Sequence, residues 1–249
     1  MKAIILAAGR GNRMEKYTVD KPKCLISFAG KPLLEWQLRN LKNAGISEIG
    51  IVKGYCADKI TIPGLEYFVN PEWSTTNMVH SLLCAHKWLE KEICIISYAD
   101  ILYPAGIVTR LIHDTNDIAI TYDRNWGQLW TKRFGNPLND SETFRVDDQG
   151  FITEIGNRPS NINEIKGQYM GLIKITSHGY SIVNEYLKSV DPAIRRKMDM
   201  TTLFRSLISI GTMIHSVGVS EPWLEFDNPN DIEVYSTLLK EGKLDPIFR

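Results

Sequence analysis

Short apolar runs alternate along the chain with segments whose apolar residues recur at helical spacing. Residues 3–6, 49–52 and 93–97 are such runs with almost no polar alternation, which is typical of strands buried on both faces of a parallel sheet. Residues 32–45 and 77–89 carry apolar side chains at helical spacing. The alternation predicts an α/β fold with a mixed, mostly parallel sheet and helices on both faces.

The first predicted strand runs directly into a glycine-rich loop. Gly9 and Gly11 let the backbone come close to a ligand and adopt positive φ, which turns successive N–H groups toward an anion. Arg13 and Lys23 supply the positive charge that a triphosphate requires. The stretch therefore favours a nucleoside triphosphate site over a plain strand-to-loop turn.

Two better-known glycine loops do not fit this stretch. A Walker loop requires Lys and then Ser or Thr after its second glycine, but Asn12 and Arg13 follow Gly11. A dinucleotide fingerprint requires a third glycine, and Met14 stands in its place.

Two aspartates far apart in the sequence are candidates for catalysis. Asp100 lies just beyond the run 93–97, and open α/β sheets bind ligands beyond the carboxyl ends of their strands, although an aspartate there also commonly forms a turn or cap. Near the C-terminus, Asn230 and Glu233 are spaced as a capping box and Asp231 fits the first helical turn. This leaves Asp227 without a structural role.

The segment LAAGRGNRM followed by DKPKCLI resembles the N-terminal signature of the nucleotidyltransferases that activate sugar 1-phosphates, phosphocholine and related phosphorylated metabolites. The resemblance implies a Rossmann-like α/β/α sandwich with a β-rich insertion on the acceptor side. It implies nucleotide binding by the matching residues Leu6, Ala8, Gly9, Gly11, Arg13 and Lys23. It also implies that Asp100 and Asp227 hold Mg²⁺, an ion that prefers hard oxygen ligands. Glu15 and Lys16 stand where the family usually has a proline.

The expected reaction needs charge and alignment rather than a general base, because a phosphate monoester is already an anion at neutral pH. We expect Lys23 to neutralise the α-phosphate and Arg13 the leaving pyrophosphate. Lys23, Arg13, Asp100 and Asp227 are thus the predicted catalytic residues.

The stretch FVNPEWSTTNMVHSL replaces the Gln and Gly-Thr segment of the sugar-phosphate enzymes. It looks more like the phosphocholine and phosphonate cytidylyltransferase branch, which implies CTP as the nucleotide and Asn77 and Ser81 as nucleotide contacts. A helix N-terminus capped by Asn77 or Thr76 explains the same residues, and the two interpretations are compatible.

Residues 123–170 form the expected acceptor region, for which the residues allow different interpretations. One is an aromatic cage for a choline-like cation, built from Tyr122, Trp126 and Trp130. Another is a basic site for an acceptor that bears a carboxylate as well as a phosphate, built from Lys132, Arg133, Arg145 or Lys166. A third is a solvated β-rich flap with tryptophan packed beneath it. The basic stretch favours the second interpretation, with Lys132, Arg133 and Tyr169 as acceptor contacts.

Composition limits the partners of the protein. The formal charge of the 249 residues is zero, so no long-range field favours nucleic acid or an anionic membrane, and no apolar run approaches the length of a membrane span. We expect a cytoplasmic enzyme and a single domain over residues 1–249, with a nucleotide-binding half (1–122) and an acceptor-binding half (123–249). Residues 203–210 and the tail offer apolar surface that a homodimer would bury.

These expectations favour a CTP-dependent cytidylyltransferase that joins CMP to a small phosphorylated acceptor for cell-surface or capsule decoration. The named acceptors of the branch are phosphoglutamine, phosphocholine and aminoethylphosphonate. The alternative is a sugar 1-phosphate nucleotidyltransferase that uses UTP, dTTP or GTP. A nucleotide-binding regulatory domain is a third hypothesis, which the pair of predicted metal ligands disfavours.

Overall fold

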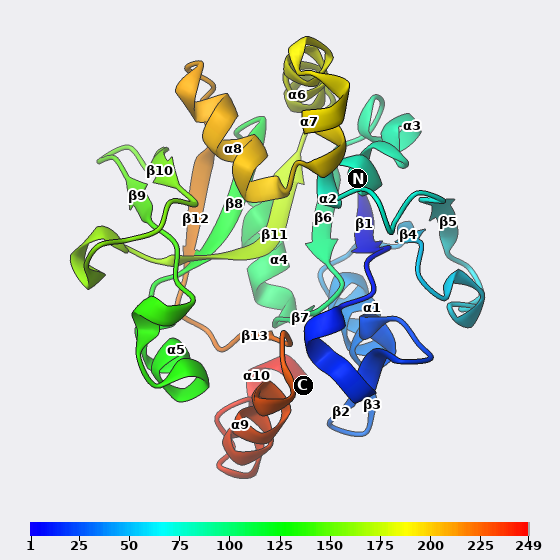
Figure 1. The fold of residues 1–249 in the computed structure, drawn as a ribbon, viewed down its shortest axis with the longest axis vertical. Helices are drawn as coiled ribbons and strands as arrows, with labels where there is room; N and C mark the ends of the chain where they lie inside the picture. The colour runs from blue at the N-terminus through cyan, green and yellow to red at the C-terminus, as the bar shows by residue number, and fades with distance from the viewer. Residues whose placement is uncertain (249) are drawn as a thin grey trace.

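A twisted seven-stranded sheet forms the centre of the molecule (Figure 1). The structure is a computed structural model that describes residues 1–248. The sheet has the order β12-β8-β11-β6-β1-β4-β5. Its strands are β1 (Lys2–Ala7), β4 (Ile49–Lys53), β5 (Glu66–Val69), β6 (Cys94–Tyr98), β8 (Ile118–Asp123), β11 (Gln168–Ile175) and β12 (His215–Val219).

One strand of this sheet runs against the others. β11 pairs antiparallel with both β6 and β8, whereas the remaining neighbours pair in parallel. The first residues of β11 therefore lie at the sheet edge where β6 and β8 end. Gln168 pairs with Asp123 and Leu172 with Ser97. The mixed, mostly parallel sheet agrees with the prediction, and its carboxyl edge is where ligands bind in such folds.

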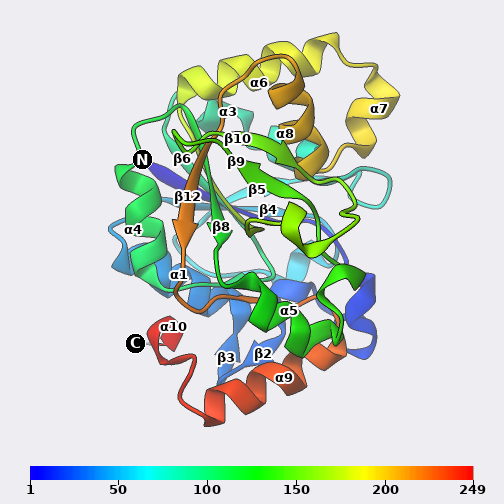
Figure 2. The ribbon, with the colours of Figure 1, turned by 90° about the vertical axis from the view of Figure 1, so that its left-hand side faces the viewer.

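Helices cover both faces of the sheet, and Figure 2 shows them on either side of the strands. One face carries α2 (Met78–Leu83), α3 (His86–Leu89), α6 (Ser177–Ser189), α7 (Pro192–Lys197) and α8 (Met200–Ser209). The other carries α1 (Leu33–Asn43), α4 (Ala105–His113) and α5 (Trp126–Phe134). Alternate residues of β1 enter the two cores, Ile4 on the first side and Ile5 on the second.

A third, smaller core joins the two ends of the chain. It lies among α9 (Pro229–Lys240), α10 (Asp245–Phe248) and the short pairs β2 (Ser27–Phe28) with β3 (Lys31–Pro32) and β7 (Ile101–Leu102) with β13 (Leu224–Glu225). Phe226 and Tyr235 are fully buried there and their rings meet edge to face. This core fixes the late segment that carries Asp227.

The acceptor region differs from the expected flap because it begins with a helix, α5. The β part is the two-stranded pair β9 (Phe144–Val146) and β10 (Ile152–Ile155). Trp126 and Trp130 are 5% and 3% exposed, so these indoles belong to the core and the predicted aromatic cage is wrong.

The helix after Asp227 also starts two residues earlier than expected. Asn228, not Asn230, caps α9, and Asp231 completes the capping box in place of Glu233. Asn230 instead donates its side-chain amide to the backbone oxygen of Arg133.

Two further expectations concern the apolar surface for a homodimer and the lack of a membrane span. Leu203, Phe204 and Leu207 are buried inside the molecule, which leaves Ile210 as the exposed apolar residue of the stretch 203–210. The homodimer stays a prediction. Among residues 1–248 no helix is long and apolar enough to cross a membrane.

Candidate active site

The glycine loop makes room for the lysine that follows it. Gly11 has φ +71°, and a Cβ at this position would meet the Cε of Lys23 at 2.8 Å. Lys23 therefore runs beneath the loop because residue 11 has no side chain. Gly9 differs from the expectation, since its φ is not in the left-handed region, and a Cβ there would meet open space.

The loop turns sharply after Arg13, where the family usually has a proline. Glu15 adopts φ 48° and ψ −116° inside the 3-10 segment Asn12–Thr18. The Thr18 hydroxyl donates to the backbone oxygen of Gly11 and ties the segment back to the loop. A strained residue and a threonine hydrogen bond thus shape this part of the chain.

A short strand pair brings the two candidate aspartates together. Asp100 follows β6, and the strand β7 after it pairs antiparallel with β13, so that Glu225 lies opposite Ile101. The backbone N–H of Phe226 donates to the oxygen of Asp100 at 2.9 Å. Asp227 consequently lies at the sheet edge that β6 ends on.

Lys23 connects these carboxylates. Its Nζ lies 2.7 Å from Oδ2 of Asp100 and 3.2 Å from Oδ1 of Asp227. Burial lowers the pKa of Lys23, but the charges of Asp100 and Asp227 outweigh it and raise that pKa above its ordinary value. The ammonium therefore stays charged in a side chain that is only 12% exposed.

Arg13 reaches the same cluster from the solvent side. Its Nη2 lies 2.9 Å from Oδ1 of Asp227, and 66% of its side chain is exposed. Burial raises the pKa of Asp227, yet Lys23, Arg13 and Arg133 together hold it below the ordinary range. Asp227 is thus an anion that three cations of the chain neutralise.

Arg133 lies in a position that differs from the predicted one. Its side chain is fully buried, and its guanidinium bonds Asp231 through Nε at 2.9 Å and Nη2 at 3.1 Å. It also pairs with Glu225 at 3.0 Å and Asp227 at 3.4 Å. The guanidinium of Arg133 is buried and bonds these carboxylates. The prediction that Arg133 contacts the acceptor is therefore wrong.

Of the two other predicted acceptor contacts, Tyr169 lines a cavity together with Asp227, whereas Lys132 lies elsewhere. Tyr169 lies at the start of β11, and its ring packs edge to face against those of Tyr98 and Phe204. Lys132 is exposed and lines a separate pocket between α5 and α9. The structure does not bring it to the aspartates.

Of the predicted nucleotide contacts Asn77 and Ser81, Asn77 has the capping role that helix propensity indicated. Asn77 caps α2 through its side-chain oxygen and donates to the backbone oxygen of Lys197. Ser81 is buried and accepts a hydrogen bond from the amide of Asn70. Neither lines the two cavities beside the loop and the aspartates.

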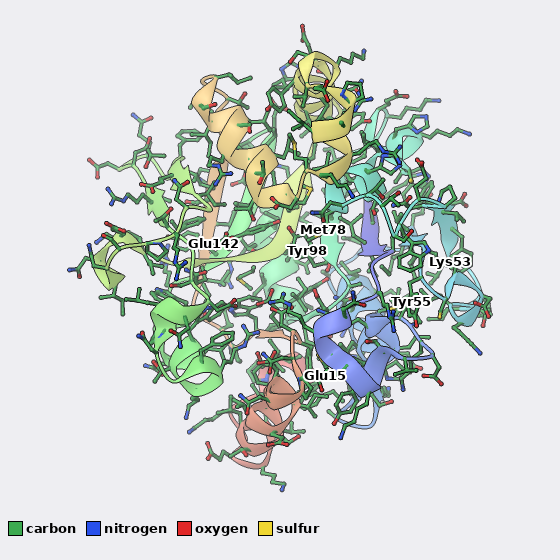
Figure 3. The ribbon with its side chains drawn as sticks, viewed as in Figure 1. Glu15, Lys53, Tyr55, Met78, Tyr98 and Glu142 are labelled. Carbon is green, nitrogen blue, oxygen red and sulfur yellow. The ribbon has the colours of Figure 1, made fainter. Side chains whose placement is uncertain are left out.

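Two adjoining cavities meet at this cluster. The smaller, of about 150 Å³, is lined by the glycine loop, Lys23 and Asp100. The larger, of about 670 Å³, is lined by Arg13, Asp227, Glu225 and the segment 138–142. Met78 and Tyr98 line both, and Figure 3 shows them next to each other with Glu142 to their left. The cations and carboxylates therefore lie where the two cavities adjoin.

This fold and this arrangement of loop, lysine and paired aspartates define a nucleotidyltransferase. Residues 3–143 match the MobA-like NTP transferase domain, and the chain belongs to that family. It is 37% identical over 250 residues to the CTP:phosphoglutamine cytidylyltransferase of Campylobacter jejuni, an alignment that covers 94% of this chain and 98% of the relative.

Two further comparisons extend the same picture. The chain is 24% identical over 252 residues to a glucose-1-phosphate thymidylyltransferase of Streptomyces antibioticus, covering 97% of this chain and 67% of the relative. The solved inositol-1-phosphate CTP transferase of T. maritima superposes with a TM-score of 0.74 at 21% identity, covering 97% of this chain and 96% of the other. The last likeness shows the shared fold.

Proposed function

We propose that the protein is a CTP-dependent cytidylyltransferase that joins CMP to a small phosphorylated acceptor of the phosphoglutamine kind and releases pyrophosphate. The observation that carries the proposal is the 37% identity, along nearly the whole of both chains, to a CTP:phosphoglutamine cytidylyltransferase. The cluster of Lys23, Asp100 and Asp227 supports it, because it joins a loop-side cavity to a larger one.

The chain's own cations perform most of the proposed chemistry. An acceptor phosphate is already an anion, so it attacks the α-phosphorus without losing a proton to a base. Lys23 contacts both aspartates and neutralises the α-phosphate as the acceptor approaches. Arg13, at the exposed side of Asp227, binds the leaving pyrophosphate.

The residues present fit a divalent cation, for which we propose Mg²⁺. Oδ1 of Asp100 is buried and has no hydrogen-bond partner in the described part of the chain, so it has a free lone pair for a ligand. Asp227 offers a second hard oxygen, and Mg²⁺ commonly takes one or two carboxylates together with phosphates and water. When bound there, the ion supplies charge that offsets the phosphates. Among residues 1–248 no group of three or more Asp, Glu, His or Cys side chains is arranged to hold a metal ion by itself.

We further propose that residues 1–122 bind the nucleotide and residues 123–249 the acceptor, within one domain. The glycine loop and Lys23 belong to the first half, and most of the lining of the larger cavity belongs to the second. Cytoplasmic location and a role in cell-surface or capsule decoration follow as proposals, since CTP is made in the cytoplasm and activated small molecules serve such decoration.

The alternative is a sugar 1-phosphate nucleotidyltransferase. It is supported by the likeness to a glucose-1-phosphate thymidylyltransferase, which at 24% identity is weaker.

A matrix of pyrophosphate release tests the proposal. CTP, UTP, dTTP and GTP are each combined with phosphoglutamine, phosphocholine, aminoethylphosphonate and glucose 1-phosphate, with and without Mg²⁺. We expect turnover with CTP and a non-sugar acceptor only when Mg²⁺ is added. Turnover with dTTP or UTP and glucose 1-phosphate would establish the alternative, and no release in any combination would favour a regulatory domain.

A further inference from the structure

The larger cavity has one acidic wall, whose carboxylates feel nearby arginine charges but have no direct ion-pair partner among the described residues. Asp140, Glu142 and Asp199 line it, and none of them forms an ion pair with another described residue. The side chain of Asp199 accepts one hydrogen bond, from the backbone of Thr202. Desolvation and then the charge of Asp199 raise the pKa of Glu142, and desolvation and then Asp227 raise that of Asp140. Carboxylates in such surroundings favour a positively charged ligand.

A buried hydroxyl in the same wall is a second, independent sign of a ligand. Ser141 lies between Asp140 and Glu142, lines the cavity and is 7% exposed. Its Oγ has no hydrogen-bond partner within the described residues. A buried hydroxyl without a partner costs free energy, so a ligand group that bonds Ser141 stabilises the complex.

The acidic wall is held on rigid structure. The Gln168 side chain at the start of β11 donates to the backbone oxygen of Glu142 at 2.9 Å and accepts from its N–H at 3.4 Å. Asp199 caps α8, which fixes its side chain at the first turn of that helix. The backbone of Glu142 and the side chain of Asp199 are therefore held in place before a ligand arrives.

An unpaired cation stands at the same cavity. Arg158 lines it, is exposed, and forms no ion pair inside the described range 1–248. Its turn is pinned, because Arg205 donates to the backbone oxygen of Gly156 at 2.9 Å and to Oδ1 of Asn157 at 3.2 Å. Gly156 has φ +79°, and a Cβ there would overlap the methyl group of Thr201. This close packing fixes the backbone just before Arg158, which lines the same cavity as the acidic wall.

We infer that this part of the cavity binds a zwitterion: Glu142 and Asp199 take an ammonium group of the acceptor, and Arg158 takes a carboxylate. The inference rests on the proposed function and narrows it. The acceptor is then a phosphorylated α-amino acid, with its phosphate end at the aspartates and its amino-acid end here. Phosphocholine and aminoethylphosphonate carry a cationic group without a carboxylate, so each satisfies only half of the site.

Acceptor kinetics with paired variants and analogues test this assignment. The acceptor is glutamine phosphorylated on its side-chain amide, and its analogues are acetylated on the α-amine or converted to the α-carboxamide. We expect Glu142→Gln and Arg158→Gln each to raise the acceptor KM about 10-fold or more, because each loses a charge-assisted hydrogen bond. Glu142→Gln should have little effect on the KM of the N-acetyl analogue, and Arg158→Gln should have little effect on the KM of the carboxamide.

The control is Glu185→Gln, which removes an exposed carboxylate of α6 far along the chain from the cavity lining. In the two test variants, kcat and the KM for CTP should stay within about twofold of wild type, because neither Glu142 nor Arg158 lines the cavity at the glycine loop. Acceptor KM values no higher than that of Glu185→Gln, with normal turnover, would overturn the zwitterion site and leave the proposed function standing.

Calorimetric titration of the same phosphorylated glutamine into wild-type protein separates the two claims. Binding that weakens in Glu142→Gln, without CTP-dependent turnover, would support the site and contradict the proposed function. Absence of both binding and turnover would contradict both, and a clear preference for phosphocholine would overturn the role of Arg158.

Discussion

Two groups of carboxylates line the two adjoining cavities, and they differ in the source of the positive charge that opposes them. Asp100 and Asp227 are neutralised by Lys23, Arg13 and Arg133 of the chain itself. Asp140, Glu142 and Asp199 have no such partner among the residues described. Buried charges persist when they are paired, so the first group is stable without ligand. The second group is ready to bind positive charge from outside.

The largest expected effect is a loss of stability when a cation that balances the first group of carboxylates is removed. Arg133→Met leaves Asp231 buried without its cation, and removing one partner of a buried ion pair typically costs about 3–5 kcal/mol. Urea unfolding should show this loss in the free energy of unfolding. The neighbouring change Lys132→Met is the control and should stay within about 0.5 kcal/mol, because that side chain is exposed. Equal stability of the two variants would contradict the structural role of Arg133.

The next effect is on turnover. Lys23→Ala removes the cation that contacts both aspartates and should lower kcat about 100-fold or more, as losing one electrostatic donor does at comparable sites. Pyrophosphate release measures kcat, and thermal unfolding checks that the fold remains. Lys21→Ala removes a nearby lysine outside the ion-pair cluster and should have little effect. Near-normal turnover of folded Lys23→Ala would refute the catalytic assignment.

A smaller effect concerns pH and stability. Burial and then the charge of Asp227 raise the pKa of Glu225 to about 8. The folded protein therefore keeps a proton there that the unfolded chain releases near pH 4, and stability falls as pH rises from that value through about 8, by at most about 1.4 kcal/mol per unit. Glu225→Gln should lose this slope in urea unfolding at pH 5.5 and 7.5. Parallel pH profiles of the variant and wild type would show that Glu225 ionises normally.

The smallest effect is expected for Lys132. It lines a pocket on the α9 side of α5 and not the larger cavity, so Lys132→Met should change the acceptor KM by less than about twofold. A rise comparable to that of Arg158→Gln would show that the acceptor extends across α5.

Local sequence pattern was enough to predict part of the site. The strand β1, its glycine loop and Lys23 are contiguous, and Asp100 directly follows a recognisable strand. The meeting of Asp100 with Asp227 came from the family resemblance, because the pairing of β7 with β13 is non-local and each strand has two residues. No periodicity is readable in so short a segment.

The position of Arg133 had a signal that was not used. Trp126, Trp130 and Arg133 are spaced at i, i+4 and i+7, which places them on one face of a helix. Reading the segment as a helix buries all three together, as the structure does. The acidic wall had no comparable signal, since Glu142 and Asp199 come from segments that only the tertiary fold brings to one cavity.

Crossed kinetics of Lys23→Ala and Glu142→Gln tests the difference between the two carboxylate groups most directly. With CTP saturating and phosphoglutamine varied, we expect Lys23→Ala to lower kcat while the acceptor KM changes little. Glu142→Gln should raise the acceptor KM while kcat is retained. If both variants instead lower kcat and leave the acceptor KM unchanged, the second group does not bind the acceptor and the division between chemistry and recognition is contradicted.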